Sequence, residues 1–173
     1  MSLKKSKSLI VFYSKPGENF CIGNVEDGNT KRLACMIQKE LQCDMIELLP
    51  VESYPEGLDD FVEYALNQKE KNERPKYKNK IDSIEDYDTI FFAHPVYHSD
   101  IPMIMHTFID NFSSEFEGKI VYPVCTHEGS GGNITSNILK RRLKKSIVKK
   151  GFSVYGQDVD LSKKKLQDWL KSL

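Results

Sequence analysis

The chain has 173 residues, which suits one domain with a single core under helices on both faces of a sheet. Its 25 basic and 25 acidic residues balance, so the charge gives no indication of a nucleic-acid partner. No apolar run approaches the roughly 18 residues that a membrane span needs, and no small-residue cleavage site follows the basic start. We therefore expect no membrane partner and a cytoplasmic protein.

The four cysteines are scattered along the chain without a CxxC pair: Cys21, Cys35, Cys43 and Cys125. This spacing argues against a zinc site and against a thioredoxin-type motif. We expect free thiols, buried or idle in a reducing compartment.

Five short apolar runs predict strands. The first, third and fourth are continuous and rich in β-branched and aromatic residues, as expected for strands buried on both faces. The second and fifth are less complete and suit the edges of a sheet. Because proline cannot donate a ladder hydrogen bond, Pro123 in the fourth run predicts a bulge or an irregular end. In chain order the runs are 9–13, 45–49, 89–93, 120–125 and 152–155.

Apolar residues at helical spacing fill the segments between these runs and predict helices. These stripes cover residues 33–41, 58–65, 104–112, 134–147 and 166–173. Strands and helices in alternation are typical of a doubly wound α/β fold. We therefore expect one domain over residues 1–173, a three-layer, five-stranded parallel sheet of order 2-1-3-4-5 with helices on both faces.

Ligands of open α/β sheets bind beyond the carboxyl ends of the strands, where the strand order reverses. For the order 2-1-3-4-5, the strand order reverses between the first and third strands. The loops that follow the first, third and fourth strands are therefore the candidates for a binding site. The first loop, residues 14–28, is long and ends at a helix start, where free N–H groups suit a phosphate. Ser14, Asn29 and Thr30 add side-chain donors, although Asn or Thr there is also an ordinary helix cap.

The second loop, residues 94–102, carries two prolines and Tyr97. The flat face of Tyr97 suits stacking on an aromatic ring. His94 and His98 lack a third ligand at a sensible spacing, and Asp100 suits a helix cap, so we expect no metal.

The third loop, residues 126–133, contains three glycines that allow its backbone to approach a ligand closely. A flexible surface loop is the alternative. His127 followed by Glu128 could pass for half of a hydrolase site. Because no Ser or Cys stands in a GxSxG context, we do not expect hydrolysis.

Together the three loops resemble those of the flavodoxin family, in the branch with a widened first loop. The similarity covers nearly the whole chain in order, through residues 12–14, 28–30, 86–91, 94–97, 103–108 and 125–131. The resemblance implies FMN held without a covalent bond. It also implies that FMN carries the redox chemistry, tuned by stacking, hydrogen bonds and local charge.

By this resemblance the first loop holds the FMN phosphate, the second flanks the isoalloxazine and the third approaches its pyrimidine edge. In that order the residues are Ser14, Asn29 and Thr30; Pro95, Val96 and Tyr97; Thr126, His127, Gly129 and Ser130. His127 would stabilise negative charge on the reduced flavin, whereas Glu128 would oppose it. The chain departs from the family in its long insertion after Ser14 and in its neutral charge, since electron carriers are typically very acidic.

The expected function is electron transfer, or a small FMN-dependent oxidoreductase with quinones or nitro compounds as acceptors. A carrier needs a charged docking face, whereas a reductase needs a pocket beside the flavin, completed by a folding loop or by the partner in a homodimer. We expect Phe20, Ile22 and Tyr97 to form such a pocket, which favours the reductase. The alternative is a binding module that keeps the fold without redox activity. The sequence leaves the redox partner and the acceptor open.

Overall fold

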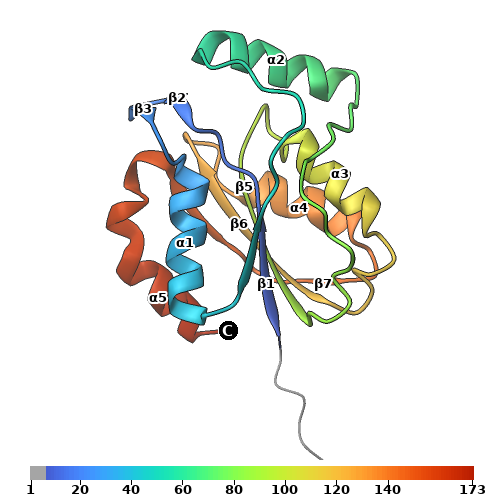
Figure 1. Cartoon of the computed structure of the whole chain (residues 1–173). Coiled ribbons are helices and arrows are strands. Elements are labelled where there is room, and N and C mark those ends of the chain that lie inside the picture. The colour runs from blue at the N-terminus through green and yellow to red at the C-terminus, as the bar shows by residue number, and fades with distance from the viewer. Residues whose placement is uncertain (1–6) are drawn as a thin grey trace, which may run out of the picture.

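The computed structural model describes residues 7–173, and a parallel sheet forms its centre (Figure 1). The strands are β1 (Ser8–Phe12), β4 (Asp44–Glu47), β5 (Thr89–Pro95), β6 (Ile120–His127), β7 (Ile147–Val148) and β8 (Phe152–Tyr155). Their order is β4-β1-β5-β6, with β7 and β8 both pairing with β6 at the far edge. The predicted order 2-1-3-4-5 is confirmed, except that the fifth strand is split in two.

The split lies beside Pro123. Ile120 pairs with Ile147, but Val124 pairs with Phe152, so the edge strand has one more residue than β6 over this stretch. The register of β6 with β5 stays continuous. The predicted irregularity therefore falls on the neighbouring strand, where proline offers no N–H for the ladder. Ile147 lies in β7, so the prediction that the fourth helical stripe reaches this residue is wrong.

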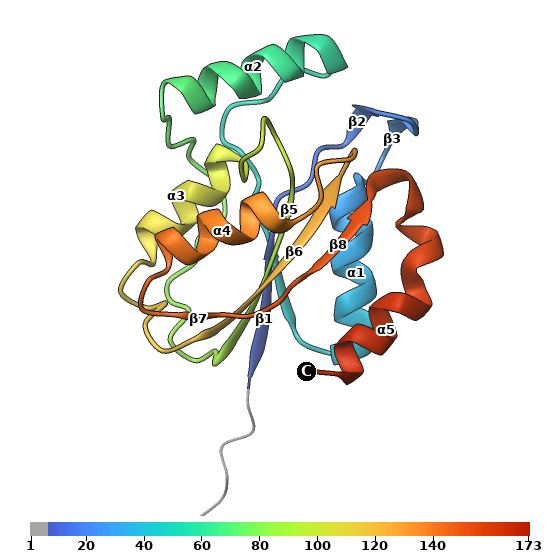
Figure 2. The same ribbon diagram turned by 180° about the vertical axis from the view of Figure 1, so that it is seen from behind.

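Both faces of the sheet are covered, as predicted (Figures 1 and 2). Helices α1 (Asn29–Leu41) and α5 (Lys163–Lys171) lie on one face, and α3 (Met103–Asn111) and α4 (Asn133–Arg142) lie on the other. Leu9 and Val11 of β1 join the core under α3 and α4, while Ile10 and Phe12 join the core under α1 and α5. This two-sided burial accounts for the continuous apolar run of that strand.

Helix α2 (Leu58–Glu70) lies beyond the carboxyl ends of the strands and not on a face of the sheet (Figures 1 and 2). A two-stranded antiparallel sheet, β2 (Gly17–Asn19) and β3 (Gly23–Val25), projects at the same end. Two short 3₁₀ turns, η1 (Gly156–Asp158) and η2 (Asp160–Ser162), precede α5. Among residues 7–173, no helix is both long enough and apolar enough to cross a membrane.

Candidate functional site

The three predicted loops meet at the carboxyl end of the sheet. The N–H of Val96 donates to the carbonyl of Thr126 at 3.0 Å, which joins the second loop to the third. The Thr30 and Thr126 hydroxyl oxygens lie 2.8 Å apart, which joins the start of α1 to the third loop. Tyr13 at the end of β1 donates its N–H to Ala93 of β5. The strand order therefore brings together the segments that the sequence analysis singled out.

The start of α1 is held against the end of β1. The Ser14 hydroxyl accepts a hydrogen bond from the Lys31 N–H at 3.0 Å, so it satisfies one free donor of the first helical turn. Gly28 lies so close to this strand end that a Cβ there would be 2.2 Å from the Lys15 carbonyl oxygen. A larger residue at position 28 would push the helix away from the strand.

The predicted phosphate residues are well covered. Ser14, Asn29 and Thr30 are all buried, and Thr30 is only 1% exposed. In the Thr30–Thr126 pair one hydroxyl donates to the other, which leaves one hydroxyl hydrogen for a third group. The first turn of α1 contains no acidic residue, and Asp27 just before it is paired with Lys31 at 2.7 Å.

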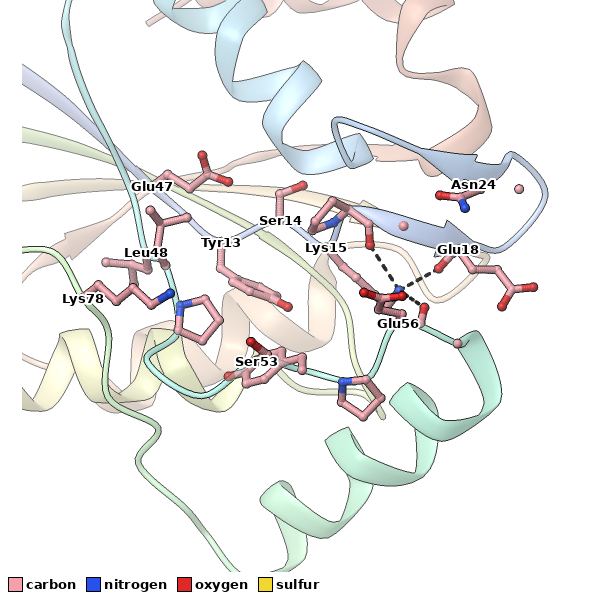
Figure 3. Close-up of a pocket in the computed structure, with 18 residues that line it drawn as sticks. Tyr13, Ser14, Lys15, Glu18, Asn24, Glu47, Leu48, Ser53, Glu56 and Lys78 are labelled. Atoms are coloured by element: carbon pink, nitrogen blue, oxygen red, sulfur yellow. Dashed lines mark hydrogen bonds between the residues drawn. The ribbon is translucent and has the colours of Figure 1, made fainter.

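Lys15 fastens the first loop to the start of α2, a role that the sequence analysis missed. Its ammonium donates to the carbonyls of Pro16, Glu18 and Glu56 at 3.2, 2.8 and 3.2 Å, and these bonds use all three of its hydrogens (Figure 3). Burial lowers the pKa of Lys15. Glu18 in turn accepts from the Leu58 N–H at 2.8 Å, at the start of α2. The only sequence signal was a Lys–Pro–Gly start to an unusually long loop.

The second loop contains a tight turn with backbone strain. Tyr97 and Asp100 exchange two backbone hydrogen bonds of 2.9 Å, and the residues between them, His98 and Ser99, have φ values of +48° and +62°. Positive φ at both central positions is the geometry that usually selects Asn and Gly. Helix α2 supports the turn, because a His98 ring nitrogen lies 2.9 Å from the Val62 carbonyl.

Tyr97 is held by other aromatic rings. Its ring lies 5.0 Å from that of Phe61 and 6.3 Å from that of Tyr13, edge-on to both. Burial raises the pKa of the Tyr97 hydroxyl, so this group stays protonated. Pro95 and Val96, which precede it, are half-buried. The ring is fixed in direction, and the residue as a whole is half-buried.

Below this loop lies a buried pair of histidines. The interpretation of Asp100 as a helix cap is wrong, because its carboxylate accepts from the Ile101 N–H at 2.8 Å and lies 3.0 Å from His106 Nε2. His94 is fully buried, and burial lowers its pKa to about 4. His94 Nε2 and His106 Nδ1 have no hydrogen-bond partner in residues 7–173. The sequence analysis assigned His106 only to an apolar helical stripe.

The third loop turns sharply through glycines, with φ of +125° at Gly129 and +68° at Gly131. His127 Nδ1 accepts from the Gly129 N–H at 3.1 Å, which places the proton of a neutral imidazole on Nε2. Burial, aided by the charge of Lys165, lowers the pKa of His127. His127 is therefore mainly neutral at pH 7. Ser130, next to the glycine turn, is exposed to solvent.

Two further residues at this end were not anticipated. The half-exposed ring of Tyr155, at the end of β8, lies 4.7 Å from the ring of His127. Gly156 follows it, and a Cβ there would be 2.3 Å from both Asn29 Nδ2 and Glu128 Oε1. The absence of a side chain at Gly156 thus permits the first and third loops to approach each other. The sequence analysis placed Tyr155 only at the end of the fifth predicted strand, and Gly156 belonged to no pattern in the sequence.

The expected pocket of Phe20, Ile22 and Tyr97 is not formed. Phe20 is 51% exposed near the tip of the β2–β3 hairpin, whereas Tyr97 packs against Phe61 and Tyr13. None of the three expected residues lines the cavity of about 850 Å³ beside the first loop.

The family model described as Flavodoxin matches residues 20–173. A putative flavoprotein from Bacteroides uniformis is 22% identical, with a TM-score of 0.74, over 94% of this chain and 98% of that one. A flavoprotein from Lactobacillus acidophilus, solved in complex with FMN, is 22% identical, with a TM-score of 0.69, over 91% and 98%. An apo NADH:FMN oxidoreductase is 15% identical, with a TM-score of 0.50, over 91% and 80%. No curated protein matches the chain. Because the family model spans most of the chain, the protein belongs to the flavodoxin family.

Proposed function

We propose that the protein binds FMN without a covalent bond at the meeting point of the three loops and acts in redox chemistry. The observation that carries this proposal is the connection of all three loops through Thr126, to Thr30 by its hydroxyl and to Val96 by its carbonyl. A ligand at this point touches the start of α1 and both later loops at once.

The first loop fits the phosphate end of FMN. The start of α1 offers backbone N–H groups and a positive helix end, and its first turn has no acidic residue. Asn29 and the free hydroxyl hydrogen of the Thr30–Thr126 pair add donors. Ser14 holds this helix start in place through the Lys31 N–H. In this proposal Ser14, Asn29 and Thr30 form the phosphate site.

The second and third loops fit the ring end. Pro95, Val96 and Tyr97 would flank the isoalloxazine on one side. Thr126, His127, Gly129 and Ser130 would approach its pyrimidine edge, where the glycine turn exposes backbone N–H groups. Tyr155, an exposed ring beside His127, adds a second aromatic surface.

Bound FMN supplies the electron transfer, and the chain supplies position and charge control. His127, neutral at pH 7, presents an Nε2–H donor to the pyrimidine edge. The turn of His98 and Ser99, supported by α2, fixes Tyr97 in one direction. Lys15 keeps the first loop in place through three carbonyls.

Between an electron carrier and an enzyme, we propose that the protein is a small oxidoreductase. Its support is a cavity of small-molecule size next to the first loop, which an electron carrier does not need. The balanced total charge also differs from the strongly acidic charge typical of electron carriers that dock to a basic protein partner.

Titration of the apoprotein with FMN and with riboflavin tests the binding proposal. We expect FMN to bind at least about tenfold more tightly, because only FMN carries the charged phosphate. Ser14→Ala should weaken FMN binding and leave riboflavin binding nearly unchanged. Failure to bind either flavin would contradict the proposal and favour a binding module without redox activity. NAD(P)H oxidation with a quinone acceptor then tests the oxidoreductase.

A further inference from the structure

Helix α4 lies next to the edge strands β7 and β8 (Figure 2), and a cavity of about 250 Å³ lies between them. Its walls come from one face of α4, from the stretch between β7 and β8, and from the middle of β6. The polar lining residues are Asn133, Ser136, Lys140, Lys149, Lys150 and Ser153. Because sites for whole drug-sized ligands have volumes of about 300–1,000 Å³, this cavity suits a small ion or one end of a ligand.

The cavity lies on the opposite face of the sheet from the residues proposed for the FMN phosphate. Successive side chains of a strand point to opposite faces of the sheet. In β6, Thr126 points to Thr30 of α1, whereas Cys125, the residue before it, lines the cavity on the side of α4. No residue assigned to FMN lines the cavity. The two sites are therefore separate.

An irregularity of the edge strand places two lysines at the cavity. Between β7 and β8 the chain passes Pro123 without pairing, and this stretch contains Lys149, Lys150 and Gly151. A Cβ at Gly151 would overlap the Pro123 carbonyl oxygen, so the absence of a side chain lets this stretch lie against β6. Bulges of this kind change the direction of side chains, and both lysines line the cavity.

The charged groups that line the cavity are all positive. Lys140 of α4 joins Lys149 and Lys150, and no carboxylate is among the lining residues. Within residues 7–173, none of these three ammonium groups forms an ion pair. Lys145, which does not line the cavity, pairs with Glu117 at 2.9 Å. Because like charges close together repel, an anion between the three lysines would stabilise this arrangement.

Neutral hydrogen-bond donors complement these charges. Asn133 and Ser136 lie one turn apart on the face of α4 that lines the cavity, and Ser153 faces them from β8. The first N–H groups of α4 have no partner within the helix, and its first turn has no acidic residue. Burial raises the pKa of the Cys125 thiol to about 12, so this lining group stays neutral. Amide, hydroxyl and ammonium donors together suit the oxygens of an anion.

We propose that this cavity binds the phosphate group of a small molecule, as a second anion site apart from that for FMN. A phosphate carries up to two negative charges and several acceptor oxygens, so it can meet three ammonium groups and the neutral donors at once. A carboxylate offers one charge and two oxygens, and a cationic ligand would add to the repulsion. Free phosphate and a phosphate carried on a nucleoside share this chemistry. The proposal does not depend on the proposed function.

Calorimetric titration of the FMN-loaded protein with inorganic phosphate at constant ionic strength tests the site. We expect saturable binding of one phosphate per chain. Lys149→Gln and Lys150→Gln each remove one lining charge and should raise the Kd for phosphate at least about fivefold. Lys144→Gln is the matched control, since it removes the same charge from an exposed lysine that does not line the cavity. It should change the Kd by less than about twofold.

Two further arms sharpen the test. Ser136→Asp places a carboxylate in the cavity and should abolish saturable phosphate binding, while thermal unfolding reports whether the variant is folded. AMP and adenosine separate the two sources of phosphate. Tighter binding of AMP than of phosphate, without binding of adenosine, would assign the site to a phosphate carried on a nucleoside. Tighter binding of phosphate than of AMP would assign it to the free ion.

Absence of saturable phosphate binding, or equal losses in Lys144→Gln and Lys149→Gln, would overturn the proposal. Displacement of the phosphate by excess FMN would also overturn it, since the cavity would then hold the phosphate of FMN. If the chain takes up no FMN, the proposed function fails, and titration of the apoprotein with phosphate still decides whether the cavity binds this anion.

Discussion

The hydroxyls of Thr30 and Thr126, 2.8 Å apart, connect the first turn of α1 to the end of β6 across the intervening β5. Both residues are buried, so this bond is shielded from water. It is a direct side-chain connection between the loop proposed for the phosphate and the loop proposed for the pyrimidine edge. Removal of the Thr30 hydroxyl should therefore act mainly on the phosphate end of the bound flavin, where this residue is proposed to lie.

We expect Thr30→Val to weaken FMN binding by about 1–3 kcal/mol, the value of a hydrogen bond to a charged group, and to weaken riboflavin binding much less. Valine keeps the shape of the side chain and removes only the hydroxyl. Fluorescence titration with both flavins measures the difference. Equal losses for the two flavins would exclude Thr30 from the phosphate site.

The same pair predicts a coupling in stability. Thr30→Val and Thr126→Val should each lower the free energy of unfolding by about 1 kcal/mol, because each leaves a buried hydroxyl without its partner. The double variant should lose clearly less than the sum of the two single losses. Urea unfolding of the four proteins gives this cycle, and additive losses would contradict a direct bond.

His94 should make the stability depend on pH in the acid range. Its pKa is about 4 in the folded protein, and that of an unfolded histidine is about 6.5. Between these values the unfolded chain binds more protons, so the contribution is complete above pH 6.5 and is lost as the pH falls to 4. The loss amounts to roughly 3 kcal/mol. Urea unfolding from pH 4 to 7.5 should show a shallower pH dependence in His94→Asn than in the parent.

Ser99 should tolerate glycine and not a β-branched residue. Its φ of +62° is strained for any side chain branched at Cβ, and its own side chain is exposed, so packing changes little. Ser99→Val should lower the free energy of unfolding by about 1–3 kcal/mol, whereas Ser99→Gly should change it by less than about 1 kcal/mol. Thermal unfolding of the parent and both variants measures these changes in stability. If both variants changed the stability by the same amount, the turn would have relaxed to negative φ.

The sequence was sufficient for the sheet and its helices because burial on both faces of β1, β5 and β6 leaves continuous apolar runs. It also indicated the three loops, since strand order alone determines which loops meet. Ile147 was wrongly assigned to the fourth helix. One apolar residue at helical spacing does not reveal that the chain has already left the helix and entered an edge strand.

The side-chain details of the site were beyond the sequence for a physical reason: they depend on contacts between residues far apart in the chain. Lys15 contacts the carbonyl of Glu56, and Gly156 makes room for Asn29 and Glu128. The position of α2 beyond the strands also came from tertiary packing, because its apolar stripe is compatible with either location. Local patterns carry no signal for any of these contacts.

The last prediction concerns His127 and the reduction potential of the bound flavin. Its Nδ1 is occupied by the Gly129 N–H, so only Nε2–H can donate to a flavin at this point. Burial lowers the pKa of His127, so the imidazole is already neutral at pH 7 and acts as a hydrogen-bond donor, not as a cation.

His127→Leu removes the donor and should lower the two-electron reduction potential by about 20–30 mV, which corresponds to about one hydrogen bond. Because burial lowers the pKa of the imidazole, the difference from the parent should be nearly the same at pH 7 and at pH 9. His127→Gln keeps an N–H donor, so its reduction potential should lie between those of His127→Leu and the parent. Spectroelectrochemistry of the three FMN-loaded proteins at both pH values measures these differences. A His127→Leu protein whose potential equals that of the parent would place His127 out of reach of the flavin and leave the backbone N–H groups of the glycine turn as the donors.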